Sequence, residues 1–96
     1  MRKPKLETTV KLLSEPTNYA IVHLPTRNFP GVVVQGDSLN ALVSELEEAL
    51  KDIANQNFKE AADIIADRLD TLRAARGQYE KVCRENAITL PYPVPR

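Results

Sequence analysis

The feature that most constrains the fold of this chain is a change in the spacing of its apolar residues at positions 36–38. Before Gly36, short segments rich in β-branched residues alternate between two faces, which is typical of strands. After Ser38, apolar residues recur every three or four positions, which is typical of amphipathic helices. Gly36 lets the backbone bend, and Asp37 or Ser38 can accept hydrogen bonds from the free N–H groups of a first helical turn. The chain is therefore expected to be an α+β protein.

Three strands are predicted in the first third of the chain, at about residues 7–14, 19–25 and 29–35. Pro16 and Asn18 separate the first strand from the second, and the segment 25–28 separates the second from the third. Both segments contain proline, which supplies no hydrogen-bond donor to a ladder, and asparagine, which tolerates turn geometry. The second strand is apolar on both faces. Connections this short predict an antiparallel meander.

Two helices are predicted to follow, at about residues 38–54 and 58–86, and to cover the sheet. The apolar stripe of the first helix consists of Leu39, Leu42, Leu46, Ala49 and Ile53, and it is widened by Val43 and Leu50. The segment 55–57 favours a link, because its amide side chains compete for backbone hydrogen bonds. In the second helix Arg76 occupies the stripe beside Gly77, so a kink is expected there.

At about 1.5 Å per residue, the second helix would be roughly 43 Å long and the first roughly 26 Å. The apolar residues of the overhang need the sheet or another chain to cover them. We therefore expect a homodimer, with a self-association seam formed by Leu69, Leu72, Tyr79 and Cys83. In the tail, residues 88–96, a proline at every second position excludes a helix. This tail is either a strap packed on the fold or a peptide offered to a partner, and we expect the strap.

Composition limits the class of function. Ninety-six residues suit a single domain, residues 1–96, and the 13 basic and 13 acidic residues cancel. No broad positive field is available for nucleic acid, and no apolar run is long enough to span a membrane, so we expect a cytoplasmic protein. A single cysteine and a single histidine leave no intramolecular disulfide and too few soft ligands for structural zinc.

Residues able to do chemistry are few. His23 lies in a strand with no nucleophile near it in the sequence, Cys83 lies on an apolar stripe that predicts a buried thiol, and Gly31 and Gly36 do not have phosphate-loop spacing. Four carboxylates of the second helix form a row, whereas a cation needs ligands that converge. We predict no catalytic residue, no cofactor and no metal.

Charge is unevenly distributed along the chain, and residues 37–57 carry one basic and five acidic groups. Two helical faces collect these and further carboxylates, and the predicted partner-binding residues are Glu45, Glu48 and Asp52 on one face, with Glu60, Asp63, Asp67 and Asp70 on the other. Acidic faces of this kind either keep a helix solvated or bind a basic partner.

One segment has a more specific pattern. Phe29-Pro30-Gly31 is followed by three valines, Gln35-Gly36-Asp37-Ser38-Leu39 and a helix with Leu42 and Leu46. Over about Tyr19 to Leu50 the chain resembles the N-terminal domain of HicB-type antitoxins. It is also similar to small uncharacterised bacterial proteins that share the Tyr-Ala-Ile-Val opening at 19–22 and the Leu-Pro-Tyr ending at 90–92.

The HicB resemblance implies a small sheet with a helix across it that binds a small RNA-cleaving toxin and blocks the toxin's active site without doing chemistry itself. The chain departs from that family after Leu50, where a long helix replaces the next strand, and it shows no DNA-binding segment after the helices. We therefore expect a non-enzymatic protein-binding module, antitoxin-like or immunity-like, whose partner is a small basic toxin.

Two other classes of function remain open. The overhanging seam favours a homodimeric structural or regulatory protein. A small-molecule-binding enzyme is the third class, because a meander and two helices can enclose a pocket, although the sequence shows no pair of nucleophile and base.

Overall fold

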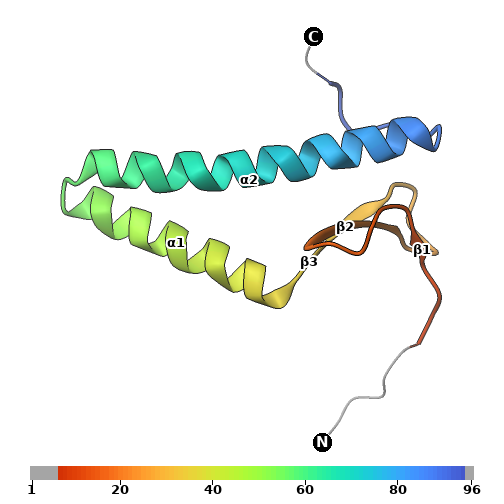
Figure 1. Ribbon diagram of the computed structural model, residues 1–96, viewed down its shortest axis with the longest axis horizontal. Helices are drawn as coiled ribbons and strands as arrows, with labels where there is room; N and C mark the ends of the chain where they lie inside the picture. Colours follow the sequence, from red (N-terminus) through yellow and green to blue (C-terminus); the bar gives the residue numbers. More distant parts are fainter. Residues whose placement is uncertain (1–6, 95–96) are drawn as a thin grey trace, which may run out of the picture.

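The computed structural model describes residues 7–94 and has the predicted α+β fold, a three-stranded antiparallel sheet followed by two helices (Figure 1). In chain order the elements are β1 (Lys11–Leu12), β2 (Tyr19–His23), β3 (Gly31–Val34), α1 (Gly36–Ala54) and α2 (Phe58–Glu85). The helices form a hairpin, and α2 is the longer of the two.

The sheet is the predicted meander, with strand order β1-β2-β3. Tyr19 pairs with Val34 and Ile21 with Val32, whereas β1 pairs through only two residues instead of the predicted 7–14. At the C-terminal end of β1 the reason lies at Ser14, whose Oγ accepts the Ile21 N–H at 2.8 Å in place of a backbone carbonyl. A side chain thus ends the ladder between these two strands.

Helix α1 begins at Gly36, two residues earlier than predicted, and the first helical bond runs from the Leu39 N–H to the Gln35 carbonyl at 2.9 Å. Gln35 alone separates this helix from β3, so the chain has no room to fold back across the sheet. Helix α1 instead leaves the end of the sheet and packs along the N-terminal half of α2 (Figure 1). The expectation that both helices cover the sheet is therefore wrong for α1.

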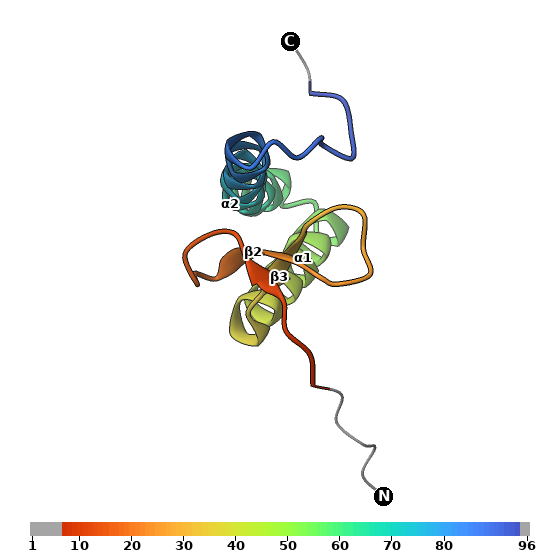
Figure 2. The ribbon, with the colours of Figure 1, turned by 90° about the vertical axis from the view of Figure 1, so that its right-hand side faces the viewer.

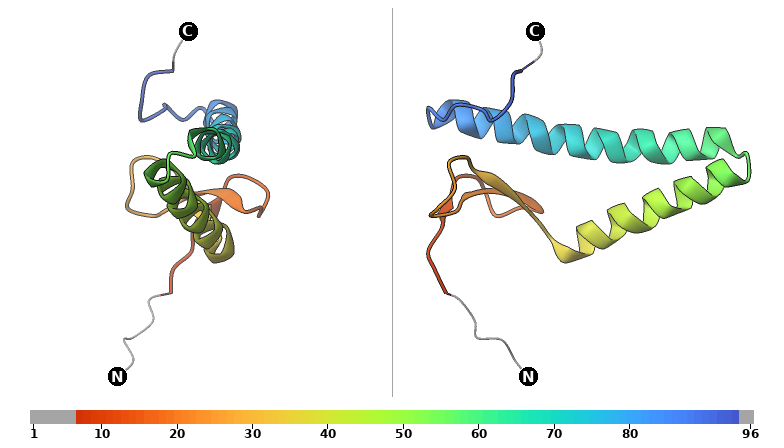
Figure 3. Two further views of the ribbon diagram at one scale, coloured as in Figure 1. Left: turned by 90° about the vertical axis from the view of Figure 1, so that its left-hand side faces the viewer. Right: turned by 180° about the vertical axis from the view of Figure 1, so that it is seen from behind.

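Helix α2 runs unbroken through Arg76 and Gly77, where we expected a kink. A Cβ atom at Gly77 would meet nothing within 4 Å, so the glycine reflects no close packing. The two ends of α2 have different neighbours: α1 lies beside the N-terminal half and the sheet lies beside the C-terminal half (Figure 3). This one helix therefore connects the two parts of the fold.

Both helices end in a Schellman motif without the usual glycine. After α1, Gln56 has φ 63°, its N–H donates to the Ile53 carbonyl, and the Asn57 N–H donates to the Asp52 carbonyl at 2.7 Å. After α2, Ala87 has φ 55° and the Ile88 N–H donates to the Cys83 carbonyl at 2.8 Å. These left-handed residues reverse the chain at both points.

The core lies between the sheet and the C-terminal half of α2. Its buried residues are Ile21, Tyr79, Val82 and Cys83, against which the partly buried Leu13, Ile88, Leu90 and Tyr92 pack. The segment after α2 lies along this end of the molecule (Figure 2). The tail is therefore a packed strap as far as Tyr92. Pro93 and Val94 are exposed, and residues 95–96 of the predicted tail lie outside the described residues.

Relief of the left-handed strain should stabilise the protein. We expect Ala87→Gly and Gln56→Gly each to raise the free energy of unfolding by about 0.5–1 kcal/mol, because glycine adopts positive φ without a Cβ clash. Ala74→Gly, at an exposed helical position, is the matched control and should lower it by about 1 kcal/mol. Urea unfolding followed by circular dichroism measures all three, and a loss of stability in Ala87→Gly would contradict the strain argument.

Candidate functional site

The contact between α1 and α2 is a seam in which small and polar side chains outnumber the two large apolar ones, Leu42 and Ile64. Its residues are the least exposed of each helix along the hairpin: Ser38, Leu42, Glu45, Ala49 and Asp52 from α1, with Ala61, Ile64, Arg68, Thr71 and Ala75 from α2. Only Ala49 and Ala61 among them are fully buried. The hairpin therefore buries little apolar surface within one chain, and apolar burial is the main source of folding free energy.

An ion pair occupies the middle of this seam. Arg68 Nη1 lies 3.2 Å from Glu45 Oε2, and their side chains are 25% and 41% exposed. The Nε of Arg68 is buried and makes no hydrogen bond with any described residue. Glu45 and Asp52, both predicted to bind a partner, thus lie half-buried between the helices and not on an open acidic face.

The strongest apolar stripes of the hairpin face away from the seam. The stripes are Leu39, Val43, Leu46, Leu50 and Ile53 on α1, with Phe58, Ile65, Leu69 and Leu72 on α2. Eight of these residues follow a seam residue by one position, and Phe58 lies two turns before Ile65 on the same face. These nine side chains, the open apolar face, are between 40% and 68% exposed. A one-residue step turns each helix by about 100°, and because the helices are antiparallel the two stripes turn to the same side of the hairpin.

The side opposite the open apolar face is acidic. It contains the residues that precede the seam by one position, and we call Glu48, Glu60, Asp63, Asp67 and Asp70 the acidic face. All five are exposed, and Lys59 Nζ forms an exposed ion pair with Asp63 Oδ2 at 3.1 Å. Five of the seven predicted acidic residues are therefore together on one surface.

The four residues of the predicted self-association seam lie in two different places. Leu69 and Leu72 lie on the open apolar face, whereas Tyr79 and Cys83 are buried in the core of their own chain, 6% and 0% exposed. The reason is that the sheet, and not a second chain, covers the C-terminal half of α2. Tyr79 and Cys83 are therefore not available for self-association.

Tyr79 is fixed by polar and aromatic contacts. Its hydroxyl donates to the Pro30 carbonyl at 2.8 Å, and its ring stacks on Tyr92 with centroids 6.4 Å apart. Burial, together with the nearby Cys83, raises the pKa of Tyr79 to about 12. Burial also raises the pKa of the Cys83 thiol, which disfavours the reactive thiolate.

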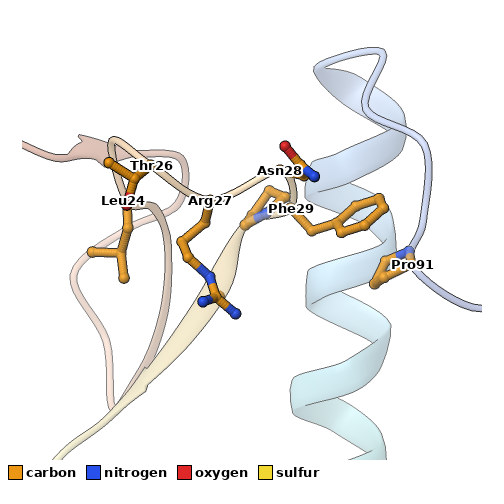
Figure 4. A pocket seen from close by; sticks show the side chains of 8 residues that line it. Leu24, Thr26, Arg27, Asn28, Phe29 and Pro91 are labelled. Atoms are coloured by element: carbon orange, nitrogen blue, oxygen red, sulfur yellow. The ribbon is translucent and has the colours of Figure 1, made fainter.

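His23, which the sequence placed in a strand, is the last residue of β2 and makes a contact across the loop between β2 and β3. Its Nε2 lies 2.8 Å from the Arg27 carbonyl oxygen. Beside this loop is a hollow of about 660 Å³ between the loop and the C-terminal strap, with Arg27, Phe29 and Pro91 in its lining (Figure 4). Arg27 is its only charged lining residue, so the hollow brings no acid and base together.

A second hollow, of about 410 Å³, adjoins the open apolar face. It lies between β3 and α2, and Val32, Val34, Leu72 and Tyr79 contribute to its lining. Because Leu72 belongs to both surfaces, apolar surface continues from the helical hairpin onto the sheet.

The sequence did not predict that α1 has two distinct faces, an inner seam with polar residues and an outer stripe of large apolar residues. The signal for this division is the position of Glu45 and Asp52, each directly before a large apolar residue, Leu46 and Ile53.

Within residues 7–94, no group of three or more His, Cys, Asp or Glu side chains could hold a metal ion. No helix in the same range is long and apolar enough to cross a membrane.

The fold and these surfaces define a small α+β protein whose helical hairpin has an apolar face and an acidic face. The chain belongs to a family of unknown function, DUF6959, which matches residues 5–92. Comparisons with curated proteins and with solved structures found no match. The open apolar face and the acidic face are therefore the features that bear on the function.

The Tyr79 contact makes a prediction about pH. The folded chain holds the phenolic proton more tightly than the unfolded chain does, so the stability due to Tyr79 is complete below pH 10 and is lost as the pH rises from 10.0 to about 12. Tyr79→Phe should weaken this pH dependence. It should also cost about 1–2 kcal/mol at neutral pH, because the buried Pro30 carbonyl loses its donor.

Urea unfolding at neutral and alkaline pH measures both effects. Tyr19→Phe is the control, because Tyr19 is a partly buried tyrosine outside the contacts of Tyr79 with Pro30 and Tyr92. Equal alkaline sensitivity in Tyr79→Phe and the unsubstituted chain would show that other groups set the pH dependence.

Proposed function

We propose that this chain is a non-enzymatic protein-binding module, antitoxin-like or immunity-like, that acts in the cytoplasm and neutralises a small basic toxin by covering part of its surface. The observation that carries the proposal is the acidic face. Four of its carboxylates, Glu60, Asp63, Asp67 and Asp70, occupy one exposed row along α2.

This row is suited to a basic partner for electrostatic reasons. Exposed like charges on one surface raise the local potential and accelerate the encounter with an oppositely charged protein. Only Lys59 pairs with a member of the row among the described residues, so most of its charge remains available. The resemblance of residues 19–50 to HicB-type antitoxins supports the same class of partner.

A second candidate function is a homodimeric structural or regulatory protein. The open apolar face favours it, because nine large apolar side chains are at least 40% exposed on one side of the hairpin. The two candidates differ in one observable: the first requires a basic partner on the acidic face, and the second requires none.

The test is affinity capture from a bacterial lysate, with intact masses measured on the eluate. We expect a small basic protein in a fixed ratio to this chain, released by high salt because exposed charge pairs are screened. The combined variant E60Q/D63N/D67N/D70N should lower its recovery at least about tenfold, since several charge pairs are lost together.

The matched control removes four carboxylates elsewhere, in the variant E7Q/E15Q/E47Q/E85Q, and should capture the partner normally. The captured protein is then assayed for RNA cleavage with and without this chain, and inhibition by the chain is expected. Equal capture by both variants, or no basic protein in the eluate, would contradict the proposal.

A further inference from the structure

We propose that a second copy of this chain covers the open apolar face, so that two helical hairpins pack face to face as a four-helix bundle. The face is defined by Leu39, Val43, Leu46, Leu50 and Ile53 on α1 and by Phe58, Ile65, Leu69 and Leu72 on α2. The inference does not depend on the proposed toxin partner, which would bind the other side of the hairpin.

The chain exposes more surface than a compact protein of its size. The chain exposes 7911 Å², whereas a compact folded protein of 10.7 kDa is expected to expose about 5,500 Å². Each partner in a standard protein interface buries about 800 Å². The excess, to which the exposed segments outside the helices and strands also contribute, is larger than the area that one such interface requires from each partner.

The spacing of the apolar residues also favours a helical interface on this face. On α1 the open stripe steps by four, three, four and three residues, which is the repeat that packs helices side by side in bundles. The inner seam has the same steps but contains Glu45, Asp52 and Arg68. The better packing surface of each helix thus faces outward, where its own chain does not cover it.

The two ends of the molecule differ in their number of layers of secondary structure. A stable domain encloses its core between at least two layers of secondary structure. At the end of α2 near the sheet, strands and helix supply two layers around Ile21 and Tyr79. At the hairpin end, α1 and α2 form one layer, and the molecule measures only 20 Å in its thinnest direction (Figure 1). A second hairpin supplies the missing layer.

The symmetry of a dimer selects this face over the acidic one. In a two-fold interface each patch meets the same patch of the other chain, so it must be complementary to itself. The acidic face would oppose carboxylate to carboxylate, whereas apolar stripes are complementary to themselves. Arg73 and Arg76 line a hollow with Leu69 and Leu72 of this surface, and both side chains are exposed, so they can remain solvated at the rim of the interface.

A face-to-face dimer also orients the remaining surfaces. The two acidic faces lie on opposite outer sides of the bundle, because each is opposite the apolar face of its own hairpin. The dimer therefore presents two separate rows of carboxylates without bringing them together.

Sedimentation equilibrium of the purified full chain, without any partner, tests the inference. We expect an assembly of two 10.7 kDa chains at tens of micromolar. Leu46→Glu and Leu69→Glu place a charge at the centre of the face, and each should raise the dimer dissociation constant at least about 100-fold. Ser44→Glu adds the same charge to the opposite side of α1 and should leave the dimer intact.

Circular dichroism establishes whether the glutamate variants stay folded. If either unfolds, the double variant L46A/L69A, which retains high helix propensity, replaces it and should weaken the dimer at least about tenfold. A single-chain mass for the unsubstituted protein would overturn the inference. So would a dimer that survives the helical substitutions and dissociates with Val33→Glu on the outer face of the sheet.

Because no partner protein enters this experiment, its failure is distinct from failure of the capture experiment. A monomer that still captures a basic protein would overturn the dimer alone. A dimer that captures none would overturn only the proposed toxin-binding function.

Discussion

The fold depends on one continuous stripe of residues along α2, which contacts helix α1 in its N-terminal half and the sheet in its C-terminal half. From Ala61 to Ala75 the stripe contacts α1 with mostly small and polar side chains, and from Tyr79 to Val82 it contacts the sheet with large apolar ones. Burial of large apolar groups contributes most to folding free energy, so the sheet end is the stronger of the two contacts. The hairpin end relies on Ala49, Ala61 and an ion pair, which leaves it short of apolar burial within one chain.

Sequence alone predicted the order and type of every element because the two apolar periods are distinct on either side of Gly36. It misplaced the ends of β1, where local chemistry competes with periodicity, because Ser14 Oγ replaces a backbone acceptor there. The helix ends were predicted to within two residues. Their left-handed terminal residues, Gln56 and Ala87, were not predicted, because neither position has the glycine that normally marks such a conformation. In this chain the helix boundaries are thus more readily predicted than the strand boundaries.

The candidate surfaces were predicted less completely, for a geometric reason. Helical spacing groups residues by face but does not say which face meets the neighbouring helix. Leu46 and Glu45 are adjacent in sequence, and only the hairpin shows that the glutamate faces inward and the leucine outward. Likewise, Tyr79 follows Leu72 along the predicted stripe, but the sheet buries Tyr79 and leaves Leu72 exposed.

The position of the core has a consequence for synthesis of the chain. Ile21 belongs to an early strand, whereas its neighbours Tyr79, Val82 and Cys83 come near the end of α2, and the strap that packs over them follows later still. The hydrogen bond from Tyr79 to Pro30 spans 49 residues of sequence. During translation the strands therefore emerge from the ribosome well before anything can bury them. Their apolar faces stay exposed to aggregation or chaperone binding until almost the whole chain has been made.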